Sequence, residues 1–207
     1  MNNIDLNEFA RLGVATVYEA SGRSGLIDLE LHQVTPGSRV AGRACTVRCG
    51  QGDNLMIHAA MAVVQPGEIL VITMPEAEAV GVVGELLATQ ALVHGAAAML
   101  INAAVRDVEE LATLGLPIWA RFIRARGATR TTLGEINVPI SIGGSTVRPG
   151  DIVVLDADGA VVVAAERAAE VLAASQAREA REAANRSKFK EGVLSIDLYN
   201  LRQNVGM

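Results

Sequence analysis

The chain has 207 residues, enough for one domain with a hydrophobic core of its own. Half of the residues are apolar, only 3% are aromatic, and the formal net charge is -5 at pH 7. This balance argues against a nucleic-acid partner, because backbone phosphates require a basic surface and bases stack on aromatic rings. The first residues show neither the cationic region nor the apolar region of a secretory leader, and no run of about 18 apolar residues follows. We therefore expect a cytoplasmic protein without a membrane partner.

The first predicted strand contains the only two cysteines, Cys45 and Cys49. Strand alternation places both thiols on one face, and we expect them to be buried and reduced. The three histidines are scattered along the chain, so they do not form a zinc-binding pattern with these cysteines. Further along, Val64–Ile72 combines a Pro-Gly turn with β-branched residues, which predicts a buried strand.

The middle of the chain is predicted to alternate helices and strands. A helix from Gly84 to His94 begins after a flexible glycine turn, and Ala97–Ile101 is a short buried strand. The next helix is predicted to begin at Arg106, with acidic residues in its first turn, and to end at Gly115 in the C-cap position.

The last part of the chain has a second Pro-Gly turn and strand at Val147–Leu155, followed by a predicted hairpin with its turn at Asp158–Gly159. Residues 166–190 are rich in Ala, Glu and Arg, which predicts a long helix. We expect residues 166–207 to belong to the same mixed α/β domain as residues 1–165 and to pack on a neighbouring subunit.

Several classes of enzyme are disfavoured by the residues present. Lys188 and Lys190 are the only lysines, and their charged neighbours disfavour a Schiff-base amine. The sequence has no Gly-x-Ser-x-Gly elbow, no Walker A loop and no strand-borne Gly-x-Gly-x-x-Gly, which argues against a serine hydrolase, a P-loop ATPase and a Rossmann dehydrogenase. An enzyme of this composition that breaks carbon–carbon bonds beside a carbonyl would need a metal ion as its electron sink.

Two strand-to-helix junctions carry the chemistry that remains. At the first, Gly81–Leu87 places the free N–H groups of Leu86 and Leu87 at a helix N-terminus, where they can bind a carboxylate. At the second, Arg106 offers a guanidinium for a carboxylate, and Asp107 offers a ligand for a hard cation. The alternative is that the acidic residues only suit helix N-termini and that Arg106 pairs with one of them.

These junctions resemble those of the class II pyruvate aldolases that cleave 4-hydroxy-4-methyl-2-oxoglutarate and 4-carboxy-4-hydroxy-2-oxoadipate, enzymes related in fold to the regulators of ribonuclease E activity. The signature of that family is an acidic residue, twenty intervening residues and Arg-Asp, and Glu85 with Arg106-Asp107 fits it without a gap. The resemblance extends over nearly the whole chain, through Leu12–Ala20, Gly52–His58, Leu116–Ala120, Val147–Asp151 and Gly192–Tyr199.

The resemblance implies a site for Mg²⁺ or Mn²⁺. Asp107 is the implied direct metal ligand, and Glu85 is implied to hold a water bound to the metal. A glutamate from the C-terminal helix of an adjacent subunit completes the water shell in the family; Glu182 has the expected register, and Glu179 is its competitor. The residues expected to bind a small-molecule 2-oxo acid substrate are Gly84, Leu86, Leu87, Arg106, Asn54 and His58, with Arg106 and Glu85 in catalytic roles. A structural role for His58 is an equal alternative.

The resemblance also implies a three-layer β/β/α domain of the swivelling kind with a long C-terminal helix, assembled as a trimer or as a hexamer of two trimers. The implied activity is retro-aldol cleavage to pyruvate, accompanied by oxaloacetate decarboxylation, in the breakdown of aromatic compounds. Two positions depart from the common pattern, because many members have Asp where this chain has Glu85 and a further Asp where it has Asn102. Two other functions stay open: a non-catalytic binding protein like the ribonuclease E regulators, and a decarboxylase or tautomerase of another 2-oxo acid.

Overall fold

The computed structural model describes residues 4–206. Its helices are α1 (Leu6–Ala20), α2 (Leu55–Ala60), α3 (Glu85–Val93), α4 (Val108–Thr113), η1 (Ala165–Arg167), α5 (Ala168–Lys190), α6 (Ser195–Leu198) and η2 (Arg202–Val205). Its strands are β1 (His32–Gln33), β2 (Val40–Arg48), β3 (Glu68–Thr73), β4 (Gly81–Val83), β5 (Ala98–Val105), β6 (Ile118–Ile123), β7 (Glu135–Ile136), β8 (Ile140–Ile142), β9 (Ser145–Val147), β10 (Ile152–Asp156) and β11 (Gly159–Val163).

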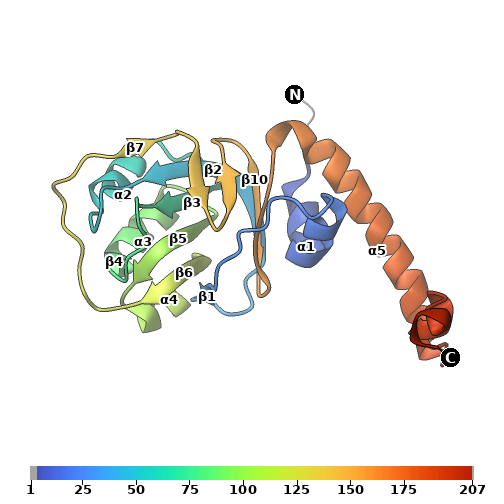
Figure 1. Ribbon diagram of the computed structural model, residues 1–207. Helices are drawn as coiled ribbons and strands as arrows, with labels where there is room; N and C mark the ends of the chain where they lie inside the picture. The colour runs from blue at the N-terminus through green and yellow to red at the C-terminus, as the bar shows by residue number, and fades with distance from the viewer. Residues whose placement is uncertain (1–3, 207) are drawn as a thin grey trace.

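A mixed sheet forms the body of the molecule, with the strand order β1-β6-β5-β3-β2-β10-β11 (Figure 1). Strands β2, β3, β5 and β6 are parallel, whereas β1, β10 and β11 pair antiparallel with their neighbours. Every residue of β5 is buried, as expected for a central parallel strand that is covered on both faces.

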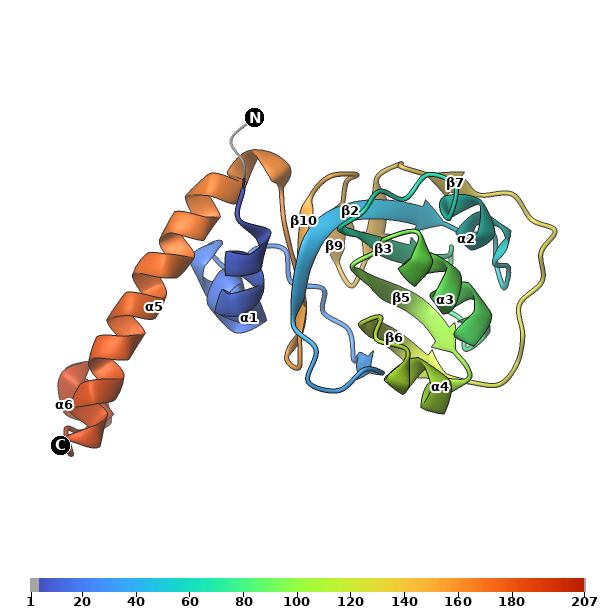
Figure 2. The same ribbon diagram turned by 180° about the vertical axis from the view of Figure 1, so that it is seen from behind.

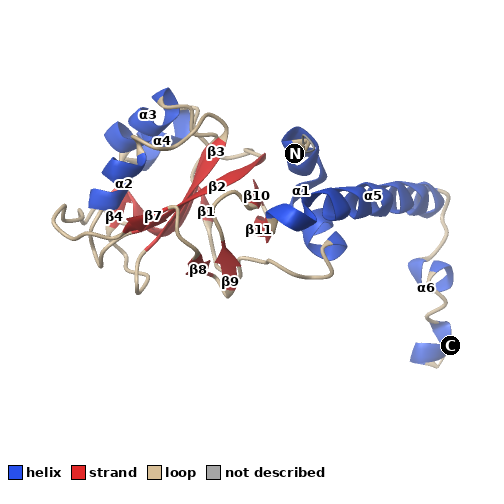
Figure 3. Cartoon of the chain, turned by 90° about the horizontal axis from the view of Figure 1, so that it is seen from above, coloured by secondary structure: helices blue, strands red, loops and turns tan. Residues whose placement is uncertain are grey.

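The body has three layers. Helices α2, α3 and α4 cover one face of the sheet, and the β8-β9 hairpin covers the other (Figure 3). The side chains of β5 alternate accordingly: Met99 and Ile101 pack in the core beneath the helices, and Ala98 and Leu100 pack in the core toward the hairpin. The predicted α/β fold with three β/β/α layers and a long C-terminal helix is therefore confirmed.

Helix α1 and the beginning of the long helix α5 lie beside the β10-β11 hairpin. Helix α1 bends at Gly13, whose φ of 80° and ψ of 169° are not helical, and it packs against β10, β11 and the first half of α5. Beyond that contact α5 projects from the body, with α6 at its far end (Figure 2). No helix among residues 4–206 is long and apolar enough to cross a membrane.

Most of the predicted elements are present, and the differences have local causes. Both Pro-Gly turns precede buried strands, β3 and β10, and both cysteines are buried and free, as predicted. The predicted hairpin turn at Asp158–Gly159 is wrong by one residue: the turn is Ala157–Asp158, because Asp158 donates its N–H to the Asp156 side chain and Gly159 already pairs with Asp156.

The middle elements also differ from the prediction at their ends. The predicted flexible turn before α3 is instead the short strand β4, which pairs with β5. Strand β5 continues past the predicted end at Ile101 to Val105. Helix α4 starts at Val108 rather than Arg106, because Asp107 has a left-handed backbone conformation that cannot continue a helix.

Candidate active site

Pairing of two parallel strands brings the two predicted junctions together. Strand β4 pairs with β5 so that Val83 lies opposite Val105, and the Arg106 N–H donates to the Val83 carbonyl at 3.0 Å. One residue, Gly84, separates β4 from α3, and two residues, Arg106 and Asp107, separate β5 from α4. The chain therefore leaves both strands at the same edge of the sheet, where ligands of such α/β folds commonly bind.

Asp107 stands at the centre of this edge. Its φ of 59° and ψ of 44° are a left-handed conformation that few non-glycine residues adopt. This conformation turns its carboxylate toward the first junction, where Oδ2 accepts the Glu85 N–H at 3.1 Å. The same oxygen lies 3.8 Å from Arg106 Nε, and both side chains are 44% exposed. The carboxylate is thus oriented by one helix N-terminus while half of it faces solvent.

Gly84 leaves the space that this carboxylate occupies. A Cβ built at Gly84 would lie 2.3 Å from Asp107 Oδ2 and 3.2 Å from Arg106 Nε. The backbone of Gly84 is extended, with φ -130° and ψ -173°, so any residue could adopt it. The absence of a side chain is needed here for close approach and not for backbone freedom.

A cavity of about 380 Å³ opens at these junctions. It is lined by Asn54, His58, Gly81, Val82, Gly84, Leu86, Leu87, Gln90, Arg106, Asp107 and Arg130. The first-turn N–H groups of α3 have no acceptor within the helix, so a carboxylate in this cavity can accept hydrogen bonds from them. Six of the predicted substrate-binding residues and the predicted metal ligand Asp107 therefore surround one cavity of the size of a small organic acid.

Asn54 lines the cavity with one polar atom free. Its Nδ2 donates to the Val82 carbonyl at 2.9 Å, which fixes which side of the amide carries the oxygen. Asn54 Oδ1 is buried and accepts no hydrogen bond from residues 4–206. Because an unpaired buried acceptor costs about 1 to 3 kcal/mol, this atom suits a donor that arrives with the ligand.

His58 is the only titratable ring at the cavity among the described residues. Its pKa is lowered from its usual value by burial and by the nearby positive charge of Arg130. His58 is therefore neutral at pH 7 and can accept or donate one hydrogen bond.

Glu85 lies on the other side of Asp107 from this cavity. Its Oε1 accepts a hydrogen bond from Thr89 Oγ1 at 2.9 Å, and it lines an adjoining hollow of about 480 Å³ together with Asp107 and Glu110. Asp107 lines both hollows, so Glu85 shares one hollow with the predicted metal ligand and does not line the substrate cavity.

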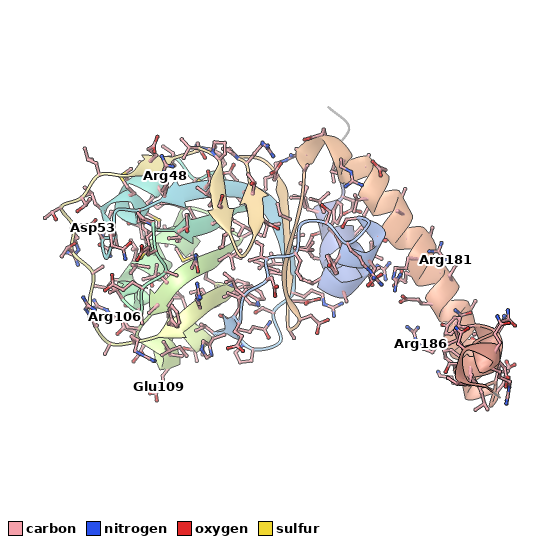
Figure 4. All side chains as sticks on the ribbon, in the orientation of Figure 1. Arg48, Asp53, Arg106, Glu109, Arg181 and Arg186 are labelled. Carbon is pink, nitrogen blue, oxygen red and sulfur yellow. The ribbon has the colours of Figure 1, made fainter. Side chains whose placement is uncertain are left out.

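The structure does not bring every predicted residue to the cavity. Glu179 and Glu182 are on α5, whereas Arg106 lies at the opposite end of the molecule from Arg181 of that helix (Figure 4). Within one chain these glutamates are therefore remote from Asp107. Asn102 is buried on β5, where its Oδ1 accepts from Arg121 Nη1 at 3.2 Å, and it does not line the cavity.

Four residues that line the cavity were not among the predicted site residues: Gly81, Val82, Gln90 and Arg130. Gln90 lies on α3 three residues beyond Leu87, so helical periodicity could have indicated it. No local pattern indicates Arg130, because it reaches the cavity from a long loop between β6 and β7.

The carboxylates fit a hard divalent cation. Among residues 4–206 no three His, Cys, Asp or Glu side chains gather as a complete metal site. Asp107 and Glu85 nevertheless line one hollow, and Mg²⁺ commonly binds to one or two carboxylates while it keeps several waters. Gly84 also leaves the Asp107 carboxylate unobstructed.

Sequence comparison gives the family. The profile described as RraA-like, Aldolase/RraA, matches residues 14–162. The chain belongs to this family. It is 30% identical over 188 residues to a protein of Halalkalibacterium halodurans named "Putative 4-hydroxy-4-methyl-2-oxoglutarate aldolase", and the match covers 90% of each chain. The family membership and the likeness to a protein with an aldolase name confirm the resemblance predicted from the motifs.

Members of the Aldolase/RraA family with solved structures share the fold. RraAS2 of Streptomyces coelicolor, described as an unusual member of the RNase ES inhibitor RraA family, matches with a TM-score of 0.77 and 27% identity, over 88% of this chain and 96% of that one. The RNA-processing inhibitor RraA of Thermus thermophilis matches with a TM-score of 0.60 and 26% identity, over 64% and 80% of the two chains. The family therefore contains proteins named as enzymes and proteins named as inhibitors.

Proposed function

We propose that the cavity at the β4-α3 and β5-α4 junctions is the active site of a divalent-metal-dependent aldolase. Its substrate is a 4-hydroxy-2-oxo acid such as 4-carboxy-4-hydroxy-2-oxoadipate or 4-hydroxy-4-methyl-2-oxoglutarate, and its products are pyruvate and a second 2-oxo acid. The observation that carries the proposal is the convergence of Arg106, Asp107 and the α3 N-terminus on one cavity. The name of the Halalkalibacterium halodurans relative supports it.

The residues of this chain would bind the pyruvyl end of the substrate. Arg106 would pair with the 1-carboxylate, because a guanidinium binds a carboxylate through two parallel hydrogen bonds. The N–H groups of Leu86 and Leu87 would donate to the same end, with the positive end of the α3 dipole behind them. Asn54 Oδ1, which lacks a donor among the described residues, would accept a hydrogen bond from a donor that arrives with the bound substrate, such as a bound water.

The metal would be held by Asp107 directly and by Glu85 through water; the observation that supports this is that both residues line one hollow. Bound Mg²⁺ or Mn²⁺ would supply the Lewis acid that makes the 2-oxo group an electron sink. We also propose that a third carboxylate comes from Glu182 of a neighbouring subunit in a trimer or hexamer. Glu179, the competitor, is engaged by Arg11, whereas Glu182 is bound, among residues 4–206, only by Arg178 of its own helix.

Cleavage would proceed by proton transfer and electron flow within the substrate. Glu85 would position a water that takes the proton from the 4-hydroxyl, and the C4–O bond becomes a carbonyl as the C3–C4 bond breaks. The electron pair of that bond passes to the pyruvyl fragment as an enolate, whose oxyanion Arg106 and the α3 N–H groups stabilise. Protonation of C3 then gives pyruvate. Loss of CO₂ from oxaloacetate leaves the same enolate, so decarboxylation should accompany the aldol reaction.

The test is pyruvate release measured with a lactate dehydrogenase couple. The two hydroxy acids and oxaloacetate are supplied after EDTA treatment, and again after Mg²⁺ or Mn²⁺ is restored. We expect release from the hydroxy acids and from oxaloacetate only when metal is present. Release from oxaloacetate alone would make the protein a decarboxylase, and release from none of them would contradict the proposal.

Arg106→Ala should abolish both activities, because it removes the charge that holds the substrate carboxylate and the enolate. Arg124→Ala is the matched control, since Arg124 is exposed and does not line the cavity, and among the described residues its guanidinium donates only to the neighbouring Ile123 carbonyl. If Arg106→Ala keeps either activity near the wild-type rate, the proposed roles are wrong.

The second candidate is a binding protein like the RraA inhibitors, which the structural likeness to RraAS2 favours. An inhibitor of a ribonuclease should bind its target without metal and release no pyruvate. Asp107 argues for the enzyme, because a carboxylate held half-exposed in a left-handed conformation has no evident use in a protein-binding surface.

A further inference from the structure

Helix α5 packs against the body of its own chain along its first half and projects beyond it (Figure 1). Its buried residues are Ala168, Val171 and Ser175. Glu182 lies seven residues beyond Ser175, about 10 Å further along the helix, so a tilt of about 10° at Ser175 would displace Glu182 by about 2 Å. Because a displacement of about 1 Å in a catalytic group can cost about a hundredfold in rate, the direction of α5 matters for any residue that it brings to a neighbouring subunit.

Two ion pairs join α1 to α5 just beyond the last buried residue of α5. Arg11 Nη1 donates to Glu179 Oε1 at 2.6 Å, and Arg11 Nη2 donates to the other oxygen of the same carboxylate. Arg178 Nη1 lies 3.7 Å from Glu19 Oε2. We call these two pairs the clamp. Arg11 precedes the bend of α1 at Gly13 and Glu19 follows it, so each half of α1 holds one of two successive residues of α5.

A buried carboxylate fixes the bend of α1. Asp156 Oδ2 accepts the Val14 N–H, the first after the bend, at 2.9 Å, and Asp156 Oδ1 accepts the Asp158 N–H in the β10-β11 turn at 2.9 Å. A Cβ built at Gly13 would lie 2.7 Å from Asp156 Oδ2, so glycine is needed here for close approach as well as for its φ of 80°. The two halves of α1 are therefore fixed relative to each other and to the sheet.

A second carboxylate orients Arg11 within the clamp. Arg11 Nε donates to Glu8 Oε2 at 2.8 Å, and Gln176 of α5 donates to Glu8 Oε1 at 3.1 Å. The hydrogen bonds from Arg11 lower the pKa of Glu8 to about 2 and also lower the pKa of Glu179, so both carboxylates are charged at neutral pH. Exposed ion pairs add little to stability, so we expect the clamp to set the direction of α5 and not to hold the fold together.

Arg178 connects the clamp to Glu182. Its Nη1 faces Glu19, and its Nη2 lies 2.8 Å from Glu182 Oε1, one turn further along α5. The donors of a guanidinium lie in one rigid plane, so the contact that orients Arg178 toward Glu19 also orients its contact with Glu182. One side chain therefore links α1 to the carboxylate assigned to the neighbouring subunit.

We propose that Arg11 and Glu19 are positioning residues, which through the clamp fix the direction of α5 and present Glu182 to the metal site of a neighbouring copy of this chain. Neither residue lines the substrate cavity or the hollow of Glu85 and Asp107, so both act through α5. This inference rests on the proposed function, because that function assigns Glu182 to the neighbouring site.

The direction of α5 can be measured in the full chain by double electron–electron resonance. Cysteines introduced at the exposed Ala157 and Ala184 take nitroxide labels, whereas the two native cysteines are buried. Labelled chains are diluted into an excess of unlabelled chain, so that the distance within one chain is recorded. We expect a narrow distance distribution with the clamp intact and a broader one in Arg11→Gln and in Glu19→Gln. Arg23→Gln removes an ion pair of Glu19 that does not reach α5, and it should leave the distribution narrow.

The effect on the metal site is measured as Mn²⁺ affinity by electron paramagnetic resonance, without substrate. Glu182→Gln should weaken Mn²⁺ binding about tenfold, the lower end for loss of a group that holds a metal-bound water. Arg11→Gln and Glu19→Gln should each weaken it about threefold, as expected if α5 keeps the required direction for about a third of the time. Added to Glu182→Gln, neither substitution should have a further effect, because no carboxylate is left to position. Arg23→Gln should bind Mn²⁺ like the wild type.

Each result decides one part of the inference. An unchanged distance distribution in Arg11→Gln and Glu19→Gln would overturn the clamp. Wild-type Mn²⁺ affinity despite a broader distribution, or a loss of affinity that persists in the Glu182→Gln background, would overturn the positioning role. Unchanged Mn²⁺ affinity in Glu182→Gln would refute the neighbouring carboxylate and this role with it. These measurements need no turnover, so failure to release pyruvate would contradict the aldolase and leave the clamp standing.

Discussion

Substitution of Gly84 by alanine should disable the site with little effect on the fold. The extended backbone of Gly84 accepts any residue, so the change carries no conformational cost. The new Cβ would lie 2.3 Å from Asp107 Oδ2, whereas Cβ contacts under 3.0 Å essentially do not occur, so the carboxylate must move by roughly 0.7 Å or more. A displacement of about 1 Å in a catalytic group can cost about a hundredfold in rate. We expect a loss of that order in kcat/KM for pyruvate release.

The fold should tolerate the change, because the carboxylate is half-exposed and can turn toward solvent. We expect a cost of about 1 kcal/mol, or roughly 3 °C in Tm. The assays are metal-dependent pyruvate release, Mn²⁺ binding followed by electron paramagnetic resonance, and thermal unfolding. Both catalysis and Mn²⁺ affinity should fall together, since one displaced carboxylate causes both.

Gly127→Ala is the matched comparison. Its Cβ would be 3.1 Å from Arg106 Nη1, the far end of a flexible side chain that can yield by a few tenths of an ångström. Its effect should therefore be much smaller than that of Gly84→Ala. Wild-type activity and Mn²⁺ binding in Gly84→Ala, or a larger loss in Gly127→Ala, would refute the idea that the missing side chain makes room for Asp107.

Three further predictions concern stability, substrate binding and assembly. Burial would raise the pKa of Asp53, but four hydrogen bonds hold it at about 2 in the folded state, below its usual value of 3.8, so ionised Asp53 contributes about 2 kcal/mol to the free energy of unfolding. This contribution is complete above pH 4 and is lost as the pH falls from about 4 to about 2. Acid unfolding of Asp53→Asn should lack this loss. Asn54→Ala should lower kcat/KM about tenfold and the free energy of unfolding by about 1 kcal/mol, because the Val82 carbonyl loses its donor; an unchanged KM and kcat would exclude the amide from the site. Glu182→Gln should weaken Mn²⁺ binding more than Glu179→Gln, and the reverse order would assign the neighbouring subunit's carboxylate to Glu179.

The elements of the fold were predictable where local chemistry decides them, and their pairing was not. Pro-Gly turns and β-branched runs identified β3 and β10, but one strand is parallel to its neighbours and the other antiparallel, which depends on distant segments. The end of β5 was missed because Asn102 and the alanines after it have low strand propensity; the strand persists there because β4 and β6 pair with it.

The candidate site was predictable in part for the same reason. The residues at the two junctions carry their signal in the sequence, since glycine before a helix and Arg-Asp after a strand are local patterns. The left-handed conformation of Asp107 has no local signal, because its neighbours would equally allow a helix start at Arg106. Asp53 and Arg130 become related only when the loop after β6 returns to α2, seventy-seven residues along the chain from Asp53 to Arg130.

The pairing of β4 with β5 has a consequence for how such sites diverge. The pairing of β4 with β5 brings Glu85 and Arg106 together. The twenty residues between them form α3, the turn after it and β5, so their number reflects the length of these elements. Natural selection for the chemistry would act on the register and not on that length. Relatives could therefore gain or lose turns of this helix and keep the same constellation, and a search by fixed spacing would overlook them.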